Sequence, residues 1–194
     1  MEPRRIYFLG FKAITQILLR DINGAKESLL QAEETVLKQG RVIPHFISSY
    51  LVGQFLFDLN ILEQAVSSND KPNILEYRKK AYQSGKKALR NSKKYAPERT
   101  EIFRLVGLYY WLTGSQNKAV KWWKTSIEEG ERLGARVELA RTYMEVGKRL
   151  LEKSSRSHEL NGIEAEAYLE KARRLFGEMD LQWDLDELDR VTSG

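Results

Sequence analysis

Apolar residues recur at helical spacing along almost the whole chain, and this periodicity constrains the fold more than any other feature. The pattern is clear in the middle of the first half, where apolar side chains follow one another mostly at three- or four-residue steps: Ile43, Ile47, Tyr50, Leu51, Phe55, Leu59, Leu62 and Val66. Such steps place side chains on one face of an α-helix, whereas a half-buried strand alternates apolar and polar residues. No segment shows sustained alternation of that kind, so the sequence predicts an all-α protein.

Prolines and glycines divide this pattern into separate helices. The prolines lie where a helix can begin and tolerate a missing N–H, and three glycines lie where helices can end: Pro3, Pro44, Pro72 and Pro97, and Gly40, Gly114 and Gly177. These signals predict eight helices and a short ninth one, at 4–20, 23–39, 43–67, 72–95, 98–113, 116–132, 136–153, 161–177 and 181–191. Short connections between consecutive helices favour antiparallel pairs.

Small residues recur at a fixed step from one predicted helix to the next. Gly107 and Ala119 are twelve residues apart, and so are Ala13 and Ala25. A third copy of the pattern has small and bulky residues in both helices: Ala140 and Tyr143 in the first, and Ala165, Leu169 and Ala172 in the second. Small residues let two helices approach closely, and bulky neighbours fill the space beside the contact. The recurrence predicts a repeated helical hairpin.

These residues resemble the tetratricopeptide repeat (TPR), whose helix pairs carry an aromatic residue, Leu-Gly, Tyr, and then Ala, an aromatic residue, Ala and Pro at such intervals. The best match consists of Phe103, Val106, Gly107, Tyr110, Ala119, Trp123 and Ser126, with Pro97 six residues before Phe103. The resemblance implies a right-handed α-α superhelix, a solenoid of about four antiparallel helix pairs. The pairs are expected at about 4–39, 43–95, 98–132 and 136–177, with a capping helix at 181–191, in one domain over 1–194.

The resemblance is uneven along the chain. The first pair has Lys12 and Gln16 where Leu and Tyr are usual, and the last pair has about thirteen extra residues around EKSSRSHELNG. The pair at 43–95 has unusually long helices, with only Gly85, Leu89 and Ser92 in suggestive places. The C-terminal part is also similar in style to repeat regions of large bacterial signalling proteins, which follow an ATPase module joined to a cyclase, kinase or DNA-binding domain. This similarity is consistent with a piece of a longer protein.

Composition and motifs bear on the compartment and on catalysis. The chain has no cysteine, which fits a reducing compartment, and its N-terminal apolar stretch is interrupted by Lys12 and Gln16 without an export cleavage site. No apolar run approaches the roughly 20 residues that span a bilayer, so we predict a cytoplasmic protein without a membrane partner. Neither GxxxxGK[ST] nor GxGxxG occurs. The only histidines, His45 and His158, are far apart and are expected to be loop or solvated residues, so we predict no enzyme activity, metal or cofactor.

A cluster of cations marks the predicted fourth helix. Segment 78–99 contains nine lysines and arginines against Glu98 alone, a net charge of +8, whereas the whole chain carries +5. Six of the lysines form two series with seven-residue spacing: Lys79, Lys86 and Lys93, and Lys80, Lys87 and Lys94. Such spacing places them on one helix face, which either is simply solvated or attracts an acidic partner or nucleic acid. The tail 178–190 is acidic, so a contact between the two segments is a further hypothesis.

The stretch GLYYWLTGSQNKAVKWW at 107–123 holds three of the four tryptophans. Trp123 and Tyr110 occupy packing positions of the repeat pattern and are predicted to be core residues. The resemblance assigns other residues to the concave surface of the superhelix: Ile14, Ile17, Leu18, Arg104, Leu108, Trp111, Leu112, Arg141, Met144 and Glu145. Trp111 between two arginines is the predicted anchor for a partner, because Trp and Arg dominate interface hot spots.

Together these features predict a non-catalytic protein–protein interaction module. Its concave face is expected to bind a peptide, a helix or a neighbouring domain of the same polypeptide, as the regulatory end of a bacterial signalling protein. The alternative is a nucleic-acid-binding helical array that uses the basic 78–99 helix. Phosphate contacts alone would give only weak, salt-sensitive binding, which makes nucleic acid the less favoured partner. The sequence does not identify the partner or the oligomeric state.

Overall fold

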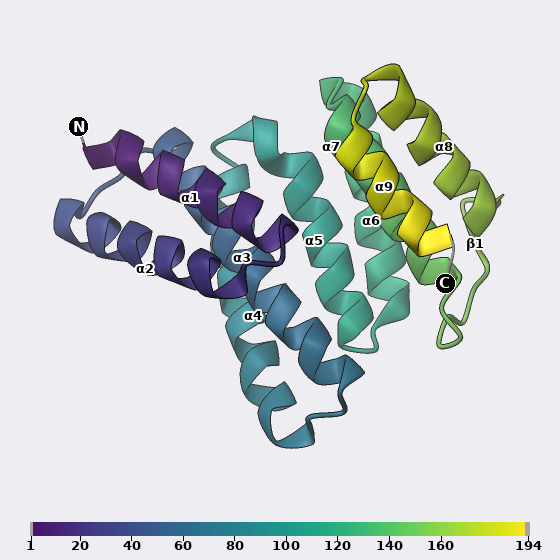
Figure 1. The fold of residues 1–194 in the computed structure, drawn as a ribbon, viewed down its shortest axis with the longest axis horizontal. Coiled ribbons are helices and arrows are strands. Elements are labelled where there is room, and N and C mark those ends of the chain that lie inside the picture. The colour runs from purple at the N-terminus through teal and green to yellow at the C-terminus, as the bar shows by residue number, and fades with distance from the viewer. Residues whose placement is uncertain (1, 193–194) are drawn as a thin grey trace. The chain divides into compact units, whose positions relative to one another are not determined.

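The computed structural model describes residues 2–192, and nine α-helices contain most of them (Figure 1). The all-α prediction is confirmed. The chain divides into two compact units, Met1–Glu98 (unit 1) and Arg99–Gly194 (unit 2). The prediction of one continuous superhelix depends on how the two units are arranged, so it stays a prediction. Each unit is described separately.

Unit 1 consists of two long helix pairs. Its helices are α1 (Glu2–Leu18), α2 (Ile22–Gln39), α3 (Pro44–Ser67) and α4 (Lys71–Ser92), followed by a 3₁₀ turn at Ala96–Glu98. Asp21 caps α2 by accepting a hydrogen bond from the Gly24 amide at 2.9 Å. Gly40 follows α2 with a positive φ of 72°, a conformation that glycine adopts without steric cost. These local signals place the helix ends within about three residues of the prediction.

Helix α1 packs on both α2 and α3, and the contact with α3 depends on glycine. A Cβ added at Gly10 would lie 2.3 Å from the backbone nitrogen of Tyr50, and one added at Gly53 would lie 3.2 Å from the Gly10 carbonyl oxygen. The Ser49 hydroxyl also donates to the Tyr7 carbonyl at 2.8 Å. The two backbones therefore nearly touch, a contact that the small-residue pattern did not reveal.

Unit 2 consists of two further pairs and a final helix. Its helices are α5 (Arg99–Leu112), α6 (Gln116–Leu133), α7 (Arg136–Leu150), α8 (Ala165–Glu178) and α9 (Gln182–Thr192). Helix α6 ends at Gly134, which has a left-handed φ of 64°. Gly177, predicted to end α8, instead lies inside its last turn, because the chain turns later, at Asp180 with a φ of 53°.

The extra residues after α7 form a small antiparallel hairpin rather than a longer helix. Strands β1 (Glu159–Leu160) and β2 (Ile163–Glu164) pair through a turn at Asn161 and Gly162. Both turn residues have positive φ, 57° and 71°, as a type I′ turn requires and as Asn-Gly favours. Helix α7 consequently stops at Leu150 instead of 153, and α8 starts at Ala165 instead of 161.

Each hairpin of unit 2 inserts one large side chain of its second helix beside a glycine of its first. A Cβ on Gly107 would lie 2.3 Å from the Trp123 indole nitrogen, and one on Gly147 would lie 2.6 Å from a side-chain carbon of Leu169. Trp123 is fully buried, which confirms its predicted core role. Tyr110 packs against the same core but is only half-buried, so it lies at the edge of the core.

Candidate functional site

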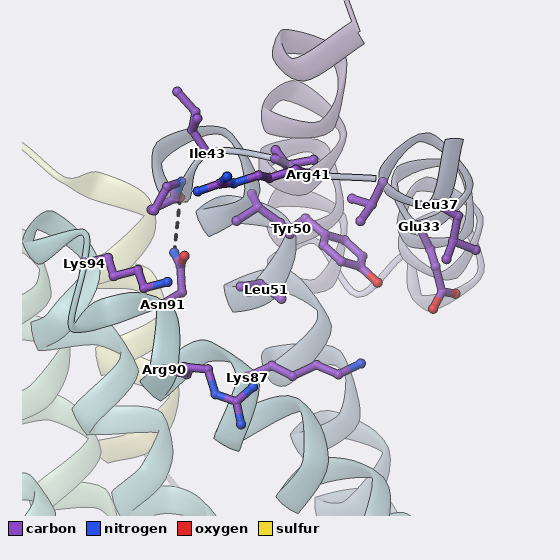
Figure 2. A pocket seen from close by; sticks show the side chains of 14 residues that line it. Glu33, Leu37, Arg41, Ile43, Tyr50, Leu51, Lys87, Arg90, Asn91 and Lys94 are labelled. Carbon is purple, nitrogen blue, oxygen red and sulfur yellow. Dashed lines mark hydrogen bonds between the residues drawn. The ribbon is translucent and has the colours of Figure 1, made fainter. Parts of the chain in front are cut away.

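A groove in unit 1 lies between the C-terminal ends of α2 and α4, across the start of α3 (Figure 2). Its volume is about 480 Å³, within the range of about 300–1,000 Å³ that is usual for ligand sites. Apolar residues provide most of its lining: Val36, Leu37, Val42, Ile43, Pro44, Ile47, Tyr50 and Leu51. The apolar surface includes Leu37, which is 75% exposed.

Local structure holds the groove in shape. Gly40 ends α2, and Pro44 occupies the first turn of α3, so the short connection between them turns sharply and displays Ile43. The Asn91 side chain near the end of α4 donates a hydrogen bond to the Pro44 carbonyl at 3.2 Å (Figure 2). This bond connects the end of α4, on one side of the groove, to the start of α3 at its base.

The charge of the groove is predominantly positive. Four cationic side chains line it, Arg41, Lys87, Arg90 and Lys94, against the single carboxylate of Glu33. Figure 2 shows Lys87, Arg90 and Lys94 along the α4 side. An apolar groove with a cationic rim favours a ligand that carries both apolar groups and carboxylates or phosphates.

Tyr50 adds a neutral polar group to the groove wall. Burial, and secondarily the charges of Glu33 and Asp58, raise the pKa of Tyr50 to about 12. The phenol therefore stays protonated even at pH values at which an ordinary tyrosine ionises. Burial also raises the pKa of the nearby Asp58 carboxyl, although hydrogen bonds from Ser84 and Gln54 and the charges of Lys80 and Lys87 oppose this effect.

The predicted basic patch is exposed along α4 and just beyond it. Lys79, Lys80, Lys86 and Lys87 lie on α4, while Lys93 and Lys94 follow its last residue, Ser92. All six are exposed. Lys80 forms an ion pair with Glu76 of the same helix at 2.5 Å. Only Lys87 and Lys94 of the six line the groove, so the sequence identified part of its rim but none of its apolar floor.

The predicted anchor, Trp111, is a core residue instead. Its side chain is only 7% exposed, its ring lies 5.4 Å from the ring of Trp123, and its indole N–H donates to Glu152 at 2.8 Å. The inserted segment after α7 supplies that carboxylate, which sequence spacing could not place. The prediction that Trp111 anchors a partner was therefore wrong.

The other predicted concave residues are all at least partly covered, although only two of them are buried. Leu108 and Ile17 are buried, whereas Ile14 and Met144 are half-buried. Spacing within the repeat predicts on which face of its helix a residue lies, but it does not show whether a neighbouring helix covers that face.

The two arginines of that predicted surface are bound within unit 2. Arg104 lies 3.5 Å from Glu101 and 3.9 Å from Glu138, and Arg141 lies 3.0 Å from Glu138 and 2.8 Å from Asp184. Burial alone would lower the pKa of Arg141, but the hydrogen bond to Asp184 and the charge of Glu138 raise it. Arg141 therefore joins α7 to α9 rather than presenting its charge to a peptide.

The acidic tail is also paired within its own unit. Besides the Asp184 contact, Glu178 forms an ion pair with Arg136, and Asp189 forms one with Arg173 at 2.6 Å. These contacts already account for several tail carboxylates, so the hypothesis that the tail contacts the basic segment gains no support.

The two histidines lie in different surroundings. His45 lies in the first turn of α3 and is half-buried, with its ring 5.0 Å from that of Tyr7 and 5.2 Å from that of Tyr95, so it is neither in a loop nor fully solvated. His158 lies exposed in a loop. Within residues 2–192, no three or more His, Asp or Glu side chains cluster closely enough to hold a metal ion, and none of the helices there could span a bilayer.

Comparisons with protein-family models, with curated proteins and with solved structures give no match. The TPR resemblance therefore stays a prediction from the sequence.

Proposed function

We propose that this protein is a non-catalytic binding module that holds an acidic, partly apolar protein segment in the groove between α2 and α4. The observation that supports this function best is the combination of an apolar floor with four cations and one carboxylate around it. Apolar side chains of the segment would pack on Ile47 and Leu51, and its carboxylates would face Arg41, Arg90 and Lys94. Such charge complementarity favours fast and selective association.

This proposal keeps the predicted class of function but moves the site. The groove lies between the second helices of the two pairs of unit 1, α2 and α4, whereas the sequence assigned binding to the first helices. The first helices of unit 2 use their arginines in internal ion pairs, which supports the change. In a larger signalling protein, a module of this kind would serve as the regulatory end by capturing an acidic segment of another domain or protein.

The test is a titration of the intact chain with two labelled synthetic peptides. Both have Leu at every third or fourth position of twelve residues, with Glu elsewhere in one and Lys elsewhere in the other. We expect the Glu peptide to bind at least about tenfold more tightly, a difference of about 1.4 kcal/mol. Ile43→Ser and Lys94→Glu should each weaken this binding by about tenfold, because both residues line the groove.

Two matched variants provide the control. Leu75 is 73% exposed on α4 and Lys79 is exposed on the same helix, and neither lines the groove. Leu75→Ser and Lys79→Glu should therefore leave the affinity unchanged. Equal losses from the control and groove variants, or none from the groove variants, would refute the proposed site.

A nucleic-acid partner is the second candidate, because all six lysines of the basic patch are exposed. An RNA or DNA ligand would bind along α4, with an affinity that falls steeply as salt rises. Charge reversal at Lys79, Lys86 and Lys93 would then abolish binding. We expect negligible retention of a labelled single-stranded oligonucleotide at physiological salt, and submicromolar binding there would reverse the order of the two candidates.

A further inference from the structure

Helix α1 exposes a large face that mixes aromatic residues with cations. Phe8 is 67% exposed, and Phe11, three residues further along the helix, is also exposed. The residues around Phe8 form a hollow lined by Arg4, Arg5, Leu9 and Lys12. Between Pro3 and Arg20 the sequence contains no acidic residue, so these cations are not balanced by carboxylates within that stretch.

The repeated hairpin identifies the equivalent face in unit 2. Ala13 corresponds to Gly107, because each is followed by a small residue twelve positions later. Gly107 corresponds in turn to Gly147, because each contacts a large side chain of the second helix, Trp123 or Leu169. Helix α1 therefore corresponds to α7, with Ala13 at the place of Gly147. The correspondence also holds seven residues earlier in each helix, where Ile6 and its counterpart Ala140 are both fully buried.

In α7 this face is covered by α6. A Cβ added at Gly130 of α6 would lie 3.2 Å from the Leu139 side chain, and the Thr142 hydroxyl lies 3.0 Å from the Ser126 hydroxyl. Tyr143 also contacts Glu131 through its hydroxyl at 3.4 Å. These contacts involve Leu139, Thr142 and Tyr143 of α7, and Val146, one turn after Thr142, is fully buried on the same side of the helix.

Their counterparts in α1 are Arg5, Phe8, Leu9 and Lys12, four of the five residues that line the hollow. We propose that this face of α1 is the seat of a partner helix, which lies on α1 as α6 lies on α7 and carries carboxylates opposite Arg5 and Lys12. The cations at two positions that are apolar in α7 determine this chemistry, because a helix with lysines there would be repelled. The surface is separate from the α2–α4 groove.

The probes are two peptides with the α6 sequence, residues 116–133, held helical by a hydrocarbon staple between positions 121 and 125. Both of these positions are exposed in α6, and the staple is needed because isolated helices of this length are marginal. One peptide carries Gly130→Glu, which faces Arg5 in the proposed arrangement, and the other carries Gly130→Lys. Fluorescence anisotropy against the intact chain gives the affinities.

We expect the Glu peptide to bind at least about tenfold more tightly than the Lys peptide. Phe8→Ser and Arg5→Glu should each weaken its binding by about tenfold, whereas Leu75→Ser and the groove variant Lys94→Glu should leave it unchanged. The groove variant separates this proposal from the proposed function, because each site can fail while the other is supported.

Three outcomes would overturn the proposal. The first is equal or absent binding of the two peptides, and the second is binding that Phe8→Ser does not weaken. The third is a different occupant. Sedimentation of the chain alone would reveal self-association that Phe8→Ser abolishes, and flotation with vesicles of anionic phospholipid would reveal a lipid surface, which cationic amphipathic faces also bind.

Discussion

Both units bring helices together at glycines, and unit 2 adds ion pairs between different helices. In unit 1, α1 meets α3 through a direct backbone contact at Gly10, with Ser49 and Gly53 opposite. In unit 2, ion pairs join different helices, as between Arg104 and Glu138 or between Arg141 and Asp184. The sequence of unit 1 carries 16 cationic and 10 acidic residues, a net charge of +6, whereas unit 2 carries 16 and 17, a net charge of −1.

This contrast explains why the candidate sites lie in unit 1. Unit 2 pairs several of its arginines with its own carboxylates, so these charges partly neutralise one another. Unit 1 has a surplus of cations that line the groove and the exposed face of α1. A partner that supplies carboxylates would complement this surplus.

The largest expected effect tests whether Trp111 belongs to the core of unit 2. Trp123→Ala and Trp111→Ala should each lower the free energy of unfolding by about 3–5 kcal/mol, because both remove a buried aromatic ring. Trp183 is more exposed, so Trp183→Ala should cost about 1 kcal/mol or less. Urea denaturation followed by circular dichroism measures all three. A Trp111→Ala cost close to that of Trp183→Ala would restore Trp111 as a surface residue.

The second effect tests the close helix contact of unit 1. Gly10→Ala should lower the free energy of unfolding by about 1–3 kcal/mol, because the new methyl group would collide with the α3 backbone. Gly177→Ala is the matched control, since nothing lies within 4 Å of a Cβ at that helical position. It should change stability by less than about 1 kcal/mol, in the favourable direction. A Gly10→Ala variant as stable as the parent chain would show that α1 and α3 can separate at no cost.

The smallest expected effect is a loss of stability at low pH, which we expect in unit 2. Burial alone would raise the pKa of Glu145, but the charges of Arg149 and Lys148 lower it to about 2. A carboxyl with a depressed pKa in the folded state stabilises the protein above its unfolded pKa, and this contribution is lost as pH falls. Unit 2 should therefore lose about 1–2 kcal/mol between pH of about 4.5 and 2.

Tryptophan fluorescence measures this loss selectively, because all four tryptophans lie in unit 2. Urea midpoints from fluorescence should fall with pH over that range, and Glu145→Gln should flatten the dependence. Glu34→Gln changes an exposed glutamate of unit 1 and should leave the fluorescence profile as it was. An unchanged slope in Glu145→Gln would rule out this carboxyl as the cause.

The sequence determined the helices and most of their ends. Periodicity, prolines and capping residues are local signals, so eight predicted starts lie within two residues of the observed ones, and the exception is α8. The small-residue step also identified the contact region of Gly107 and Trp123, whereas the contact of Leu169 with Gly147 was not predicted. The Asn-Gly pair at 161–162 is a local signal for a β-hairpin, but the prediction assigned these residues to a helix.

Only the tertiary structure decided which residues are exposed and which charges meet. Trp111 is buried because Trp123 and Glu152, twelve and 41 residues away, converge on it. The groove likewise brings together Ile43, just before α3, and Lys94, just after α4, which are 51 residues apart in the sequence. Periodicity assigns a residue to a face of its own helix, but what covers that face depends on packing between segments distant in sequence, which no local pattern encodes.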